Sequence, residues 1–89
     1  MKTGVVDTVI DGDTFTLESG ETIRLANVDA PEKGTPNAAK AREELNRLIG
    51  GKPITYDIKA RDVYGRLVAE VWVDGSNIND EIVRFVSGL

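Results

Sequence analysis

The stretch VVDTVIDGDTFTL, residues 5–17, decides the fold class of this chain. Strand-forming residues 5–10 and 13–17 flank Asp11-Gly12, a dipeptide that favours the positive backbone angles of a tight hairpin turn. A second turn at residues 18–20 leads into TIRLANV, residues 22–28, whose composition predicts a third strand. The chain therefore begins as a meander of three strands.

A helix is predicted after the meander. Thr35 can cap its first turn, Pro36 suits the first helical position, and Gly50-Gly51 is typical of a helix end. Apolar residues recur between these ends at spacings of three and four, which indicates one buried face. These residues are Ala38, Ala41, Leu45, Leu48 and Ile49.

The last part of the chain predicts two more strands and a closing helix. Residues 54–58 form the fourth strand, residues 61–65 a turn, and residues 67–73 an alternating fifth strand that Asp74-Gly75 ends. Asn77 can cap the closing helix. We expect four of its side chains to point toward the core: Ile78, Ile82, Val83 and Val86.

This order of elements is the layout of a five-stranded OB-fold barrel. The predicted fold class is mainly β (α+β), with one helix between the third and fourth strands and a short C-terminal helix. A chain of 89 residues has no room for a second domain, so we predict a single domain over residues 1–89. Fold alone does not decide function, because OB folds serve many ligands.

The composition excludes several classes of chemistry. The chain has no cysteine and no histidine, which rules out disulfides, thiolate zinc sites and histidine-activated nucleophiles. The net charge of -4 counts against a broad basic face for nucleic acid and leaves room only for a local basic patch.

Two further features of the sequence concern membrane association and the location of the protein in the cell. No apolar run approaches the roughly 18 to 20 residues that cross a bilayer, so we expect no membrane partner. No signal-peptide core follows Met1. The protein is expected in the cytoplasm if this N-terminus is native, and outside the cell if a signal sequence was removed.

Charged residues gather at turns and strand ends. DGDT at 11–14 and DAPE at 29–32 each carry two carboxylates, and hard cations take oxygen ligands from such groups. Arg24 and Arg66 supply guanidinium groups, which bind phosphate in a bidentate fork. Taken singly, each motif is also ordinary turn or strand sequence. Only their combination indicates a site.

Together, four motifs resemble the staphylococcal (micrococcal) nuclease family. They occur in the family's order and run from about Val5 to Arg84. The motifs are VIDGDT (9–14), IRL (23–25) with VDAPE (28–32), DVYGR (62–66) and INDEIV (78–83).

The resemblance implies a calcium site. Asp13 and Asp29 would be the carboxylate ligands of Ca²⁺, and the backbone carbonyl of Ala30 the third protein ligand. Asp11 would not bind the ion itself but would lie next to the residues that do. The family often has threonine where Ala30 stands, but a main-chain oxygen does not depend on the side chain.

The resemblance also implies catalytic and substrate-binding roles. Arg24 and Arg66 would hold the scissile phosphate and neutralise the charge that grows in the transition state. Glu32 would orient or deprotonate the attacking water. Tyr64 would bind a terminal phosphate of the nucleotide, although a partly buried turn aromatic explains it equally well. Val63 stands where many relatives have a phosphate-binding lysine, so one contact is missing.

The implied activity is calcium-dependent hydrolysis of single-stranded or frayed DNA and RNA by a monomer, leaving 3′-phosphate ends. The family continues past the second helix into base-stacking residues and a third helix, whereas this sequence stops at Leu89, which predicts weaker substrate binding. Two alternatives stay open. One is a non-catalytic OB-fold module that binds nucleic acid or protein, and the other is an inactive barrel subdomain of a larger nuclease.

Overall fold

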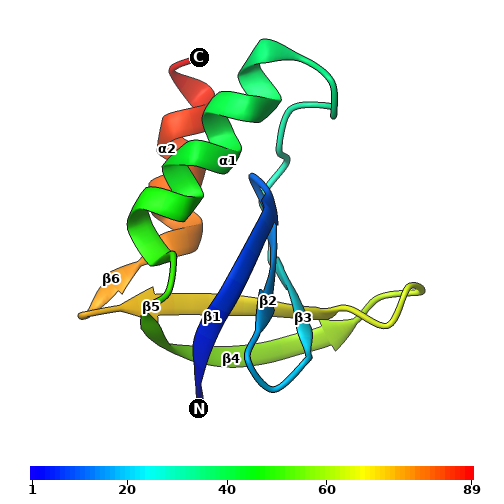
Figure 1. Cartoon of the computed structure of the whole chain (residues 1–89), viewed down its shortest axis with the longest axis vertical. Helices are drawn as coiled ribbons and strands as arrows, with labels where there is room; N and C mark the ends of the chain where they lie inside the picture. Colours follow the sequence, from blue (N-terminus) through cyan, green and yellow to red (C-terminus); the bar gives the residue numbers. More distant parts are fainter.

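The computed structural model describes residues 1–89 and confirms the predicted architecture of a closed five-stranded barrel with two helices (Figure 1). The helices lie side by side at one end of the barrel. In chain order the elements are β1 (Lys2–Asp11), β2 (Thr14–Leu17), β3 (Thr22–Leu25), α1 (Pro36–Ile49), β4 (Pro53–Arg61), β5 (Leu67–Val73), β6 (Ser76–Asn77) and α2 (Ile78–Ser87). Both helices are too short and too polar to cross a membrane.

The barrel is closed by one parallel strand pair. Antiparallel pairing joins β1 to β2 and β4, β2 to β3, and β4 to β5. The parallel pairing of β3 with β5, in which Arg24 lies opposite Val68, then joins the two ends of the sheet. Ala26 extends this seam by donating its N–H to Ala69 O at 2.9 Å.

A buried asparagine ties α2 to this seam. Asn79 is 3% exposed, and its side-chain amide donates to Ala26 O and Ala69 O, both at 3.0 Å. Its carbonyl oxygen accepts the N–H of Val71 at 2.9 Å. The amide thus satisfies three backbone groups that end inside the protein, as buried polar groups require. No pattern in the sequence had indicated a role for Asn79.

The core lies inside the barrel and under the helices. The strands contribute Phe15 and Ile23, and the helices contribute Leu45 and Ile82, all with no exposed surface. The prediction for α1 is confirmed, since Ala41, Leu45 and Ile49 form its buried side and Thr35 caps it.

Three details of the predicted helices and strands are wrong. Val83 is 42% exposed, because a helical turn of 3.6 residues places it away from the face of Ile78 and Ile82. The third strand ends at Leu25, three residues early. The fourth strand runs on to Arg61, so this residue belongs to β4 and not to the turn. The prediction that Asp74-Gly75 ends the fifth strand is confirmed, and the positive φ angles of these residues, 49° and 82°, turn the chain into β6.

Candidate functional site

Two aspartates share the turn between β1 and β2. Asp11 Oδ1 accepts the backbone N–H of Asp13 at 3.1 Å, and Asp13 Oδ1 accepts the hydroxyl of Thr14 at 2.8 Å. Burial raises the pKa of Asp13 from 3.8 to about 6, and the hydrogen bond and charge of Asp11 act in the same direction. Burial also raises the pKa of Asp11, but the hydrogen bonds from Asp13 outweigh it and lower that pKa overall. The turn therefore holds crowded negative charge.

Close packing places this turn against α1 and the loop after β3. Gly12 does not have the positive φ that the hairpin pattern suggested. A Cβ at Gly12 would instead lie 2.7 Å from the Cβ of Ala41 and 3.4 Å from that of Ala30. Glycine is needed here because neighbours approach closely, not because of the backbone angle. The same contact brings Ala30 next to the turn that carries Asp13.

Arg24 reaches Asp13 from β3. Its Nη2 lies 3.5 Å from Asp13 Oδ2, and the two side chains are 26% and 14% exposed. The guanidinium also donates to Leu25 O at 3.3 Å and to Val28 O at 3.2 Å. These two carbonyls lie at the end of β3 and in the loop after it. Arg24 therefore connects the end of β3 to the turn that carries Asp11 and Asp13, the acidic turn.

A second group of polar side chains lies on the β4–β5 hairpin. Arg66 Nε donates to Asp62 Oδ2 at 2.6 Å, and Asp62 Oδ1 accepts the N–H groups of Tyr64 and Arg66 at 2.9 Å. The Arg66 guanidinium lies over the Tyr64 ring, 5.3 Å from its centroid. Tyr64 is 80% exposed, so its explanation as a partly buried turn aromatic is wrong.

Asp62 was part of the hairpin motif but received no role from the sequence. Its hydrogen bonds to Arg66 and Tyr64 lower its pKa overall, against the opposing effect of burial. An acidic residue four positions before an arginine, across a Tyr-Gly turn, is the signal that could have identified it.

The register relates the two groups. Arg24 lies opposite Val68 in the parallel pair, and Arg66 is two residues before Val68. Arg66 directly precedes β5, and because strand side chains alternate and Ile23 and Leu67 are buried, we expect Arg66 on the outer side of the barrel with Arg24.

The remaining predicted residues lie in the loop between β3 and α1. Asn27 adopts a φ of 60°, which ends the strand and redirects the chain before Asp29. Asp29 is exposed and lines a hollow of about 230 Å³ that also borders Val83 and Val86 of α2. Glu32 is exposed as well, and its side chain has no hydrogen-bond or ion-pair partner.

The donor chemistry of these residues fits a hard cation. No three carboxylates converge anywhere in the chain to hold a metal ion, and the ligands that the family resemblance implies are Asp13, Asp29 and the Ala30 carbonyl. All of these are oxygen donors, which Ca²⁺ prefers. The crowded charge of Asp11 and Asp13 is also the kind of environment that a cation stabilises.

Comparison with known proteins places the chain in a family. The model of the family described as "Staphylococcal nuclease homologue" matches residues 22–87. The chain belongs to the staphylococcal nuclease family. The matched staphylococcal nuclease segment contains Arg24, Asp29, Glu32 and Arg66, and it begins after the acidic turn.

Individual relatives in the staphylococcal nuclease family cover most of the chain. An "Uncharacterized endonuclease" of Escherichia coli is 38% identical over 85 residues, which is 91% of this chain and 56% of that protein. "Endonuclease YhcR" of Bacillus subtilis is 41% identical over 100 residues, covering 91% of this chain and 8% of that protein. "Staphylococcal-like nuclease CAN1" of Arabidopsis thaliana is 29% identical over 62 residues, covering 70% and 19%. The chain thus spans little more than half of the Escherichia coli relative.

Proposed function

We propose that this chain is a calcium-dependent phosphodiesterase that cleaves single-stranded or frayed DNA and RNA and leaves 3′-phosphate ends. The observation that carries the proposal is the contact of Arg24 with Asp13 at 3.5 Å. It sets a guanidinium beside a carboxylate suited to a cation. A phosphate could then bind the guanidinium and the cation at once. The family and the endonuclease names of its relatives support the same chemistry.

The two arginines would bind and neutralise the scissile phosphate. Arg24 is held in place by two backbone carbonyls and Arg66 by Asp62, so neither guanidinium needs to be ordered when substrate arrives. Preorganised donors of this kind stabilise developing charge in the transition state, and loss of one typically costs about 3 to 4 kcal/mol. Tyr64 lies under Arg66 and would contact a neighbouring phosphate.

The cation would be held by Asp13, Asp29 and the carbonyl of Ala30. When bound, Ca²⁺ supplies polarisation of a phosphate oxygen and acidification of water. A site with two carboxylates belongs to the weaker calcium sites, with dissociation constants on the order of 10⁻⁴ to 10⁻³ M.

Glu32 would orient the attacking water or accept its proton. Its exposed, unpartnered carboxylate in the loop beside Ala30 is free to take this part, and the chain has no histidine to replace it. General-base catalysis contributes about 10²- to 10⁴-fold to a rate, so Glu32→Gln should lower turnover by this amount.

Hydrolysis of single-stranded DNA with calcium and with a chelator tests the proposal. We expect cleavage only with calcium, products with 3′-phosphate ends, and loss of activity in Glu32→Gln and Arg66→Ala. Arg84→Ala is the matched control, because Arg84 forms a similar ion pair, with Glu81, on the surface of α2. Full activity in chelator would contradict the proposal.

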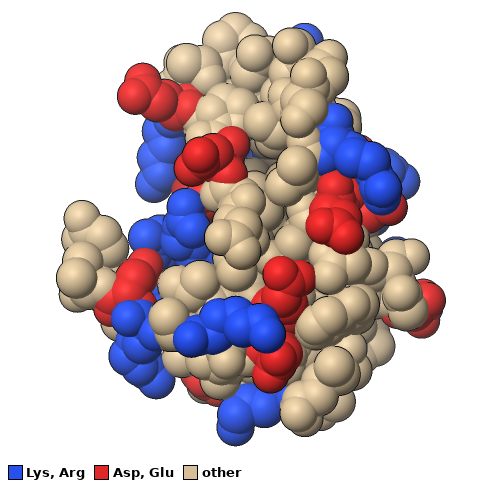
Figure 2. All heavy atoms as spheres, turned by 180° about the vertical axis from the view of Figure 1, so that it is seen from behind, with Lys and Arg blue, Asp and Glu red and all other residues tan.

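A binding module remains the second candidate. Figure 2 shows basic and acidic side chains interspersed on one face, without a broad basic surface, and the net charge is -4. Calcium and a nucleotide bisphosphate should each tighten the binding of the other in an enzyme of the proposed kind. Independent binding of the two ligands would favour the module.

A further inference from the structure

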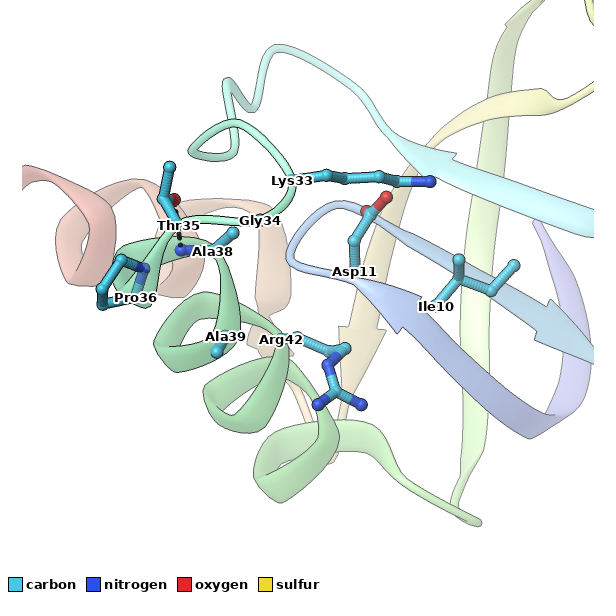
Figure 3. A pocket seen from close by; sticks show the side chains of 9 residues that line it. All are labelled: Ile10, Asp11, Lys33, Gly34, Thr35, Pro36, Ala38, Ala39 and Arg42. Atoms are coloured by element: carbon cyan, nitrogen blue, oxygen red, sulfur yellow. Dashed lines mark hydrogen bonds between the residues drawn. The ribbon is translucent and has the colours of Figure 1, made fainter.

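A hollow of about 560 Å³ adjoins the acidic turn on the side of α1 (Figure 3). Residues from the end of β1, the loop before α1 and the first turns of α1 line it. Asp11 is common to this hollow and to the candidate site, because its carboxylate accepts the N–H of Asp13. If the phosphate of a nucleic-acid strand binds at the Asp13 site, the next nucleotide of that strand can therefore lie in this hollow.

Two basic side chains border the hollow. Lys33 reaches over it from the loop and Arg42 extends from α1 on the other side of Asp11, as Figure 3 shows. Both are exposed, and neither forms an ion pair, whereas Arg47, on the same helix as Arg42, is paired with Glu44. Lys33 lies near enough to Asp11 to stabilise its charge, whereas Arg42 forms no ion pair and its guanidinium is free to bind an anion.

The remaining lining is largely apolar and small. Ile10 is 43% exposed, and its side chain stands at the edge of the hollow beside Asp11. Pro36, Ala38 and Ala39 form the wall on α1. The two cations flank the Asp11 carboxylate, and together with the apolar surface beside them they suit a ligand that has an anionic group on an uncharged ring, as a nucleotide does.

The hollow is limited on its far side. Arg42 also borders a smaller hollow of about 230 Å³, whose other walls carry Asp7 and Glu43, and these two charges repel phosphate. The β4–β5 hairpin, which carries Tyr64, projects from a different part of the barrel (Figure 1). The Lys33–Arg42 hollow therefore has room for one nucleotide, on the side of the site away from Tyr64.

We propose that the Lys33–Arg42 hollow is a subsite for the nucleotide next to the scissile phosphate on the side away from Tyr64. Arg42 binds its phosphate, Lys33 contributes charge, and Ile10 contacts the sugar or base. This inference rests on the proposed function for the direction of the strand, but the binding itself requires no hydrolysis.

Binding of labelled oligothymidylate, measured by fluorescence anisotropy in chelator, tests the subsite. We expect Arg42→Gln to weaken binding about tenfold, as for the loss of a charge-assisted hydrogen bond. The slope of log affinity against log salt should fall by about 0.7, because the variant neutralises one phosphate fewer. Lys40→Gln is the matched control, since Lys40 lies on α1 with the same charge but outside the hollow.

A neutral methylphosphonate placed in turn at each linkage of the oligonucleotide sharpens the test. At one position it should weaken binding to wild type but not to Arg42→Gln, because the variant has no guanidinium to meet that phosphate. Thermal unfolding checks that each variant folds, and Arg42→Lys, which keeps the charge, should retain most of the affinity. Equal binding by Arg42→Gln and Lys40→Gln would overturn the subsite.

The outcome separates this inference from the proposed function. If wild type cleaves DNA and Arg42→Gln has an unchanged KM, the subsite is wrong and the nuclease proposal stands. If Arg42→Gln selectively loses binding and wild type does not cleave with calcium, the subsite stands and the nuclease proposal fails.

Discussion

Nη2 of Arg24 lies 3.5 Å from Oδ2 of Asp13, and the same guanidinium donates to the carbonyls of Leu25 and Val28. One side chain thus connects the β1–β2 turn, the end of β3 and the loop that carries Asp29. Arg24 contacts Asp13 directly and also binds the carbonyl of Val28, which Asp29 and Ala30 follow. All groups proposed to hold the cation therefore lie at or next to residues that Arg24 contacts. Stability and function are therefore coupled at this residue.

Asp13→Asn should stabilise the cation-free protein at neutral pH. The folded-state pKa of about 6 exceeds the ordinary 3.8, so between these values the folded state binds more protons and stability falls as pH rises. The variant removes this penalty, and we expect about 1 kcal/mol, or about 4 to 8 °C in Tm, at pH 7. Thermal scans in chelator at pH 3.5 and pH 7 measure it. A gain of equal size at both pH values would contradict the assignment.

Calcium should raise the Tm of the wild type. A ligand that binds only the folded state at about ten times its dissociation constant stabilises by about 1.4 kcal/mol. Asp13→Asn and Asp29→Asn should each reduce this increment, whereas Asp80→Asn, an exposed aspartate at the start of α2, should not. Calorimetry with calcium and with magnesium as a second arm checks the prediction. A calcium response that survives both site substitutions would place the cation elsewhere.

Gly12→Ala should destabilise the fold and lower activity together. Its Cβ would lie 2.7 Å from Ala41 Cβ, and overpacking of this kind costs about 1 to 3 kcal/mol. The double variant with Ala41→Gly restores the space but loses about 1 kcal/mol of helix propensity. Denaturant unfolding of the three variants gives a double-mutant cycle. Additive losses would show that the two residues do not compete for the same space.

Asp62→Asn should reduce turnover more than stability. Asp62 orients Arg66 through a 2.6 Å hydrogen bond, and the neutral amide cannot hold the guanidinium in the same way. We expect kcat/KM to fall about tenfold, or about 1.4 kcal/mol of transition-state stabilisation. Asp57→Asn, which breaks a surface ion pair with Lys59 on the same hairpin, is the control. Equal kinetics in the two variants would sink the positioning role.

Asn79→Ala should be the most destabilising of these substitutions. It leaves the N–H of Val71 and the carbonyl of Ala26 buried without partners, at about 1 to 3 kcal/mol each. Asn77→Ala, which removes only the cap of α2, should cost about 1 kcal/mol. Urea denaturation distinguishes the two. A smaller loss for Asn79→Ala than for Asn77→Ala would contradict its role at the seam.

The sequence predicted those features that depend on neighbours along the chain. Alternation and turn residues located the five barrel strands, and Thr35 and Gly50 correctly bounded α1, because capping and amphipathic spacing act within a few residues. The error at the end of β3 arose where the chain leaves the strand, at the positive φ of Asn27. Val83 lies within α2, and helical spacing turns it away from the buried face of Ile78 and Ile82.

For the site, the sequence by itself determined which chemical groups exist. It supplied carboxylates and guanidinium groups without any histidine or cysteine, and motifs typical of one nuclease family. Only the tertiary structure decided which of them meet. Arg24 reaches Asp13 because β2 and β3 pair, and Gly12 admits Ala41 because α1 packs on the turn that carries Asp13. Asp62 and Arg66, four residues apart, meet within the β4–β5 hairpin. Distances between segments that are far apart in the sequence are set by packing, which no local pattern encodes.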